Sequence, residues 1–145
     1  MTVTAGELDP LVRLIRHHEG LRLRAYYCPA GVLTCGYGST GPDIRLDTVW
    51  TAEQAKARML ADAERFARQT LILCPGLSGG ALCAISDFAY NLGLGRLRTS
   101  TLRRKVNSRD WAGARRELAK WIRGGGRVLP GLVARRADEA ALLGA

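Results

Sequence analysis

The stretch from residue 18 to residue 38 reads HEGLRLRAYYCPAGVLTCGYG. Its second residue, Glu19, stands at the end of an amphipathic helical pattern, where Gly20 favours termination. Apolar and polar side chains then alternate over residues 21–26 (LRLRAY), which is typical of a half-buried strand. A Pro-Ala-Gly turn follows, and residues 32–37 have the pattern of the returning strand. The stretch therefore predicts a helix that leads directly into a small antiparallel hairpin.

The helix before this hairpin carries a start signal. Asp9 is a good N-cap residue, and Pro10 fits the first helical position. The apolar side chains that follow recur at helical spacing and share a face with Glu19, namely Leu11, Leu14 and Ile15. A carboxyl group beside apolar side chains, at the negative end of a helix dipole, has its charged form disfavoured. We therefore expect Glu19 to hold a proton near neutral pH.

Helices dominate the rest of the chain. Thr51 favours the start of a long helix to about Thr70, which Cys74-Pro75-Gly76 stops, and Ser78 favours the start of the next. Further helices are predicted over residues 97–106, 110–122 and 132–143, with residues 124–126 as a flexible glycine loop. The predicted fold class is α+β and mostly helical, lysozyme-like in shape, with a small antiparallel β lobe, a larger helical lobe and a cleft between them. We expect a single domain over residues 1–145, with the β lobe at about 20–50 and the helical lobe at 8–19 and 51–143.

The composition describes a basic globular chain. Its 145 residues include 22 Lys and Arg, of which 19 are Arg, against 13 Asp and Glu, for a net charge of +9. Such a field attracts polyanions, among them nucleic acid, anionic membranes and the anionic cell wall. No apolar run approaches the roughly 18 residues that a membrane span needs, and residues 1–10 lack the pattern of a signal peptide. We therefore expect a monomer that stays in the cytoplasm of the cell that makes it until something else releases it.

The cysteines and histidines predict neither a metal site nor a cofactor. The two histidines, His17 and His18, are adjacent, and the cysteines form no C-x-x-C pair: Cys28, Cys35, Cys74 and Cys83. Small buried thiols are the simplest interpretation of most of them. A disulfide between Cys74 and Cys83 after release stays open, because sequence does not give its geometry.

Three residues of the opening stretch carry groups suited to one reaction. Glu19 ends the helix, Cys28 lies at the hairpin turn and Thr34 lies on the second strand. Glycosidic bond cleavage needs a protonated carboxylic acid and, opposite it, a group that activates or replaces water. The competing interpretation is that Glu19 is an ordinary surface residue in a salt bridge at a helix end.

The spacing of these residues resembles the Glu, Asp/Cys, Thr triad of the phage lysozymes of glycoside hydrolase family 24. The resemblance extends over residues 8–143, through several ordered motifs: Gly36-Tyr37-Gly38, Phe88 to Gly93, Ser100-Thr101-Leu102, Trp121, Leu129 to Leu132 and Arg135-Arg136. It implies that Glu19 is the general acid, that Thr34 positions the attacking water, and that Cys28 is the base or nucleophile where many relatives have Asp. It also implies substrate contacts for Gly36, Tyr37, Gly38, Asn91 and Arg135, with Arg135 bound to Glu19 or to the muramyl carboxylate.

Two departures from the family pattern bear on the chemistry. An unperturbed thiol has a pKa of roughly 8.5, so Cys28 can act as a base only if its surroundings lower that pKa, and Arg22 and Arg24 are candidates to do so. Inversion through activated water and a covalent thioglycoside route both stay open. Ser39 stands where many relatives have His, which predicts altered support of the hairpin. Asp43 and Asp47 are weaker candidates for the missing carboxylate.

The resemblance implies a muramidase of a phage or prophage, an endolysin that cuts the β-1,4 bonds between N-acetylmuramic acid and N-acetylglucosamine. Its partner would be the glycan strands of peptidoglycan, reached after a holin opens the inner membrane, without direct contact to the holin, nucleic acid or a stable membrane site. Three alternatives stay open. The chain is a catalytically silent glycan-binding or phage structural protein, a lytic transglycosylase on the same fold, or a nucleic-acid-binding protein built on its basic run: Arg96, Arg98, Arg103, Arg104 and Lys105.

Overall fold

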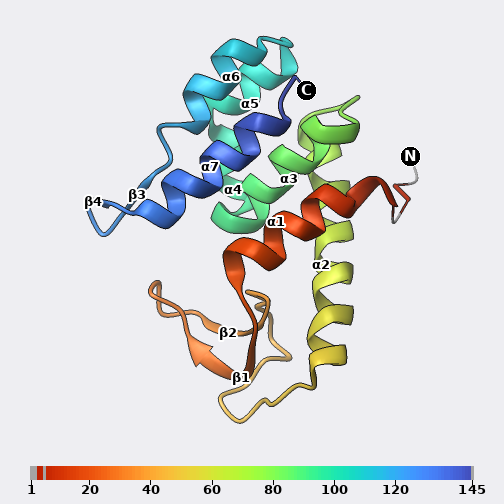
Figure 1. The fold of residues 1–145 in the computed structure, drawn as a ribbon, viewed down its shortest axis with the longest axis vertical. Coiled ribbons are helices and arrows are strands. Elements are labelled where there is room, and N and C mark those ends of the chain that lie inside the picture. Colours follow the sequence, from red (N-terminus) through yellow and green to blue (C-terminus); the bar gives the residue numbers. More distant parts are fainter. Residues whose placement is uncertain (1–2, 5, 145) are drawn as a thin grey trace.

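The computed structural model describes residues 3–4 and 6–144 of the chain. Its helices are η1 (Gly6–Leu8), α1 (Asp9–Glu19), α2 (Ala52–Leu73), α3 (Gly79–Leu92), α4 (Leu94–Thr99), α5 (Thr101–Asn107), α6 (Trp111–Leu118) and α7 (Pro130–Leu142). Its strands are β1 (Arg22–Tyr27), β2 (Leu33–Gly36), β3 (Arg123–Gly124) and β4 (Arg127–Val128). Figure 1 shows the β1–β2 hairpin at one end of the molecule and most of the helices at the other. The predicted class, mostly helical with a small antiparallel lobe, is confirmed.

Helix α1 follows its sequence pattern except at its start. Leu11, Leu14 and Ile15 are buried, as their spacing predicts. The N-cap is Leu8 and not Asp9, so the acid stands inside the first turn, where it complements the helix dipole without a capping hydrogen bond. Gly20, at φ 68°, ends the helix and turns the chain into β1.

The β1–β2 hairpin forms, but its predicted buried face does not. The strands pair antiparallel with Tyr26 opposite Thr34, and the register shifts between Arg22 and Tyr26. Leu21 and Leu23 are 41% and 40% exposed. The alternation therefore predicted the strand correctly but its burial wrongly. The two-stranded sheet has no second layer that would cover Leu21 and Leu23.

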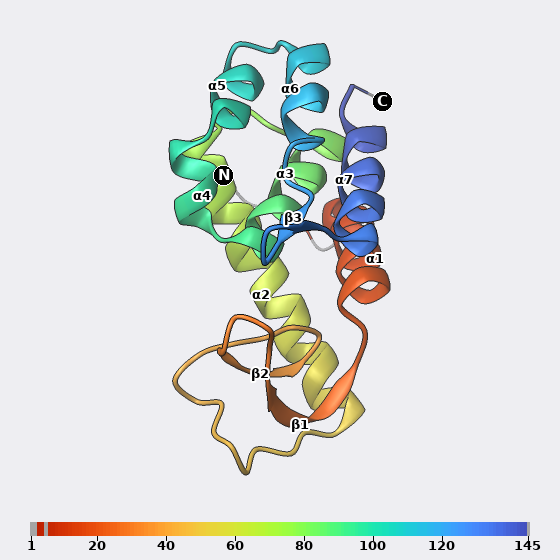
Figure 2. The ribbon, with the colours of Figure 1, turned by 90° about the vertical axis from the view of Figure 1, so that its left-hand side faces the viewer.

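Helix α2 connects the two ends of the molecule (Figure 1, Figure 2). It begins as predicted after Thr51, which forms a capping box with Gln54, and it runs one turn past the predicted end to stop before Pro75. Its buried Asp62 accepts a hydrogen bond of 2.7 Å from the hydroxyl of Ser39. The guanidinium of Arg58 donates to the carbonyl of Thr40 and to Asp43, both at 2.6 Å. These contacts fix the loop after β2 to α2, and they occupy Asp43 in a structural ion pair.

Helix α3 forms the centre of the helical lobe and packs against α1, α2 and α7. The core it helps to build is apolar, with Leu82, Ile85 and Phe88 buried on this helix. Ser78 holds the predicted N-cap position, but its side chain makes no capping hydrogen bond.

Three predicted segments differ in the structure. The helix predicted over residues 110–122 ends at Leu118. Residues 97–106 are not one helix, because the chain breaks at Ser100, whose hydroxyl accepts from the backbone N–H of Arg103 and caps α5. Residues 124–126 are not a plain loop but part of the β3–β4 hairpin. Gly125 and Gly126 stand at φ 58° and 78°, and a two-residue hairpin turn needs positive φ at both central positions.

The described part of the chain has four free thiols, of which Cys35, Cys74 and Cys83 are buried. Burial raises the pKa of Cys74 and of Cys83, which suits unreactive core residues. Within residues 3–4 and 6–144, none of the helices combines the length and the apolar character that crossing a membrane requires.

Candidate active site

Glu19 lies where the helical lobe meets the β lobe. The last residue of α1, it keeps 21% of its side chain exposed, and its Oε2 accepts a hydrogen bond of 2.6 Å from Nη1 of Arg135 on α7. This half-buried position agrees with the sequence expectation.

Gly38 closes the other side of this carboxyl group. A methyl group at Gly38 would stand 2.6 Å from Oε1 of Glu19, and the residue has a φ of 80° that disfavours any side chain. The preceding residue is tied to α3, because the carbonyl of Tyr37 accepts a hydrogen bond of 2.6 Å from the hydroxyl of Tyr90. Burial raises the pKa of Tyr90, and the charges of Asp62 and Glu19 add to this, so the hydroxyl keeps the proton it donates. The backbone after β2 is therefore held against Glu19.

Gly36, the other glycine of the Gly36-Tyr37-Gly38 motif, allows close packing. A methyl group there would stand 2.9 Å from the ring of Trp50, and its φ is 70°. It lets the end of β2 lie against that ring.

Cys28 and Thr34 lie together on the hairpin. Thr34 is buried, and its hydroxyl donates a hydrogen bond of 2.9 Å to the carbonyl of Val32. Burial raises the pKa of Cys28, but hydrogen bonds from the backbone of Val32 and Ala30 and from the side chain of Thr34 outweigh it, so the pKa is lowered. The backbone of the hairpin turn is thus the main influence that favours the thiolate of Cys28.

The lowered pKa of Cys28 has a different main cause from the arginines considered from the sequence. Hydrogen bonds lower it, whereas the guanidinium of Arg22 stacks 4.4 Å from the ring centroid of Tyr26. Tyr26 lies within electrostatic reach of both candidate catalytic groups. Burial raises its pKa, and the charges of Glu19 and Cys28 contribute to this. Sequence reasoning did not single out Tyr26.

The guanidinium of Arg135 binds two carboxylates at once. Nη1 binds Glu19, while Nε and Nη2 donate to Asp87 on α3, both at 2.8 Å. Asp87 is fully buried and Arg135 is 3% exposed. Arg135 is buried, and three of its nitrogens are bonded to carboxylates. These contacts suit a residue that positions Glu19 better than one that contacts a sugar directly.

A second buried arginine extends this cluster to Asn91. Arg136 donates through Nη2 to Oδ1 of Asn91 at 2.7 Å and to Glu139 at 3.0 Å. Its Nε lies 2.8 Å from the other oxygen of Glu139. The side chain of Asn91, a substrate contact in the sequence prediction, is therefore tied to α7 through Arg136.

The pKa of Glu139 is raised in this cluster. Burial and the neighbouring Asp87 raise it well above the ordinary 4.5. For Asp87, burial opposes ionisation, but the hydrogen bonds from Arg135 and Glu139 outweigh it and lower the pKa. The cluster thus favours the protonated form of Glu139 and the ionised form of Asp87. Sequence reasoning missed both residues, although a lone acid in the apolar run of α3 was a signal for Asp87.

Comparison with known proteins gives a consistent result. The model of the phage lysozyme family matches residues 16–139. An endolysin of Acyrthosiphon pisum secondary endosymbiont phage 1 is 40% identical over 135 residues, covering 89% of this chain and 91% of the relative. A SAR-endolysin of Bacteriophage PS119 is 40% identical over 125 residues, covering 83% and 73%. The solved muramidase domain of SpmX from Asticaccaulis excentricus superposes with a TM-score of 0.84 at 30% identity, covering 94% and 96%.

The contact between Gly38 and Glu19 predicts unequal effects of two matched substitutions. Gly31 and Gly38 have φ values of 79° and 80°, but a methyl group at Gly31 meets nothing within 4 Å. Gly31→Ala should lower the free energy of unfolding by about 1–2 kcal/mol through backbone strain alone. Gly38→Ala should lower it further, because its methyl group also pushes Glu19 away from Arg135. Urea unfolding measures both, and equal losses would show that Glu19 does not lie against Gly38.

The raised pKa of Glu139 predicts a pH-dependent effect of Glu139→Gln. Between pH 4.5 and the raised pKa, the folded chain binds more protons than the unfolded chain, so this residue makes stability fall as pH rises. The variant has no such proton to lose. Its free energy of unfolding should therefore improve relative to the parent, by up to about 1.4 kcal/mol per pH unit in this window. Urea unfolding at several pH values checks this, with Glu64→Gln as an exposed control, and parallel curves for Glu139→Gln and the parent would contradict it.

Proposed function

Since the chain belongs to the phage lysozyme family, we propose that it cuts the β-1,4 bond between N-acetylmuramic acid and N-acetylglucosamine of peptidoglycan, with Glu19 as the general acid. One observation carries this proposal. The carboxyl group of Glu19 is held at the junction of the lobes, between the buried Arg135 and the backbone of Gly38, and it keeps an exposed edge. A general acid needs a fixed carboxyl group within reach of the leaving oxygen.

Arg135 orients the carboxyl group of Glu19 in this proposal. The same guanidinium makes two hydrogen bonds to the buried Asp87, and the hydrogen bond from Arg135 lowers the pKa of Asp87 against the effect of burial. Asp87 therefore compensates the charge of Arg135 inside the protein, and Glu19 is held by a side chain that is itself fixed.

Cys28 and Thr34 supply the opposite side of the reaction in this proposal. The lowered pKa of Cys28 increases its thiolate fraction near neutral pH, and the thiolate is the basic and nucleophilic form. Thr34 supports that thiolate and offers a hydroxyl oxygen to position water. We favour the thiolate as a base that activates water, which gives inversion at the sugar carbon.

We further propose that the enzyme serves as an endolysin that lyses the host of a phage. Two relatives with 40% identity are named endolysin and SAR-endolysin. The net charge of +9 would draw the protein to the anionic cell wall, and salt would weaken this attraction. Storage in the host cytoplasm, release through a holin and action as a monomer complete the proposal.

Glu19→Gln tests the central assignment. The amide has no acidic proton to donate, so the rate of peptidoglycan hydrolysis should fall by about 10²–10⁴-fold. Glu64→Gln is the matched control, because Glu64 makes only an exposed ion pair with Arg68 and should keep full activity. Turbidity of permeabilised Gram-negative cells measures the rate, and circular dichroism confirms that both variants are folded.

Mass spectrometry of the digest identifies the bond and the chemistry. N-acetylmuramic acid at reducing ends supports the proposed hydrolysis, whereas 1,6-anhydro ends would assign a lytic transglycosylase. If Glu19→Gln clears cells as fast as the parent, Glu19 is not the acid. A parent that binds glycan without releasing any fragment would be a silent binding protein.

Cys28→Asp and Cys28→Ser test the thiolate across pH. If the thiolate is the base, kcat/KM rises with pH as Cys28 ionises. Cys28→Asp should keep activity and move this rise to lower pH, because a carboxyl group ionises near 3.9, at about the ordinary value of Asp. Cys28→Ser should lose roughly 10²-fold, since a hydroxyl group is too weak an acid to ionise there. A serine variant with the rate and pH profile of the parent would remove Cys28 from the reaction.

A further inference from the structure

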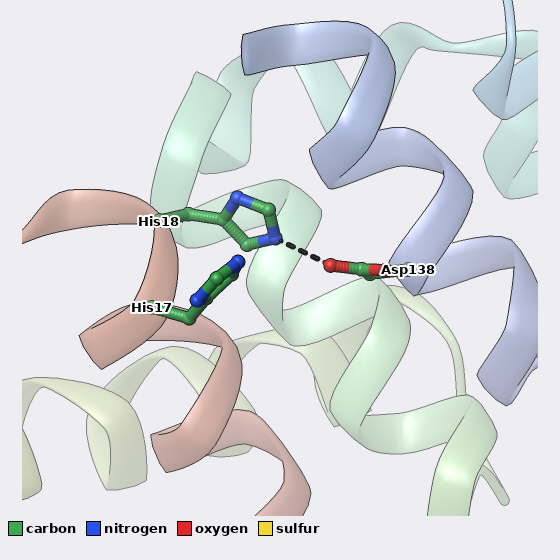
Figure 3. Close-up of side chains that lie close together, drawn as sticks. All are labelled: His17, His18 and Asp138. Carbon is green, nitrogen blue, oxygen red and sulfur yellow. Dashed lines mark hydrogen bonds and ion pairs between the residues drawn. The ribbon is translucent and has the colours of Figure 1, made fainter.

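A hollow of about 360 Å³ lies between α1 and the C-terminal part of α7, and Glu19 is not among the residues that line it. It is lined by Pro10, Arg13, Leu14, His17, Asp138 and Leu142. Beside it, His17 and His18 of α1 point toward Asp138 of α7 (Figure 3). The two histidines are neighbours in sequence, but the fold adds a carboxylate from 120 residues further along the chain.

These three side chains converge on a small volume. One ligand atom from each lies within 4.8 Å of the others, and the two imidazole rings meet edge to face with their centroids 4.7 Å apart. Nε2 of His18 lies 2.8 Å from Oδ2 of Asp138. The side chain of His18 is 8% exposed and that of Asp138 is 51% exposed. The group is therefore anchored on one side and open to solvent on the other.

We propose that His17, His18 and Asp138 bind a divalent transition metal ion of the zinc type. Three atoms no more than 4.8 Å apart have a common point within about 2.8 Å of each. Zinc takes imidazole nitrogens and carboxylate oxygens at roughly 2.0–2.2 Å, so each ligand atom needs to move by less than about 1 Å. Side-chain rotation at the exposed His17 and Asp138 provides this movement. Water completes the coordination from the solvent side.

The ligand chemistry narrows the choice of ion. Two imidazoles and one carboxylate suit zinc, copper(II) or nickel, whereas calcium and magnesium prefer oxygen ligands alone. Arg13 lines the neighbouring hollow, and its positive charge opposes any cation. Replacing Arg13 should therefore strengthen binding and not weaken it.

The bound ion would join α1 to α7, the helices that Glu19 and Arg135 also connect. Because the ligand set forms only when these helices pack, the ion binds the folded chain in preference to the unfolded chain. It should therefore raise the melting temperature progressively once the zinc concentration exceeds Kd.

Isothermal titration calorimetry with zinc chloride tests the proposal. The full chain carries Cys28→Ser throughout, so that the half-exposed thiol does not compete for zinc. One ion per chain should bind. Asp138→Asn and His17→Gln should each raise Kd at least tenfold, and Arg13→Gln should lower it. Asp47→Asn is the control, because Asp47 is an exposed acid of the β lobe, and it should leave Kd unchanged.

Thermal unfolding gives an independent measurement. Zinc should raise the melting temperature of the Cys28→Ser chain and of its Asp47→Asn variant, but not that of Asp138→Asn or His17→Gln. The absence of saturable binding up to about 1 mM zinc, or the same Kd in Asp138→Asn and in the control, would overturn the proposal. Because no readout is enzymatic, this result is independent of the proposed activity.

Discussion

The double engagement of Arg135 is the interaction on which the rest of the site depends. Its guanidinium joins Glu19 on α1 to Asp87 on α3 from a position on α7, so one side chain fixes three helices relative to one another. A buried guanidinium is stable only if its charge is paired, and breaking such a pair costs about 3–5 kcal/mol. Asp87 meets that requirement from within α3. The carboxyl group of Glu19, the proposed acid, is therefore positioned by a side chain that the core itself fixes.

The β lobe is attached to this cluster by polar contacts and by little apolar burial. Its hairpin exposes Leu21 and Leu23, so its position relative to the helices comes mainly from the loop after β2. There Ser39 binds Asp62 of α2, Tyr37 binds Tyr90 of α3, and Gly38 lies against Glu19. These hydrogen bonds join the Cys28 and Thr34 side of the site to the Glu19 side. Ser39, a departure from the family pattern, thus retains a structural role.

The sequence predicted the parts of the fold that local chemistry determines. The capping box at Thr51 and the break at Pro75 set the limits of α2, and the spacing of Leu11 and Ile15 set the buried face of α1. It failed where tertiary context decides, because the exposure of β1 depends on a missing second layer. The break at Ser100 was missed for another reason, since a local side-chain cap stands inside an otherwise helical pattern.

The candidate site shows the same division between local and tertiary information. The spacing of Glu19, Cys28 and Thr34 is visible in the sequence, and the family resemblance adds roles to it. Glu139 was not foreseeable, because it is one charge among many on α7, and only packing shows that it is fully buried beside Asp87. Likewise, two adjacent histidines gave no sign of a metal site until the fold brought Asp138 beside them.

The buried cluster also explains why Glu139 differs from its exposed neighbour Asp138. Arg135 and Arg136 face three carboxyl groups, those of Glu19, Asp87 and Glu139. Burial and the contact with Asp87 raise the pKa of Glu139. For Asp87, burial opposes ionisation, but the hydrogen bond from Arg135 outweighs it and lowers the pKa. Because isolated charges are costly in a medium of low dielectric constant, two guanidinium groups and three carboxyl groups can be buried together only if one carboxyl group favours its protonated form, and the packing of α7 against α3 selects Glu139 for this.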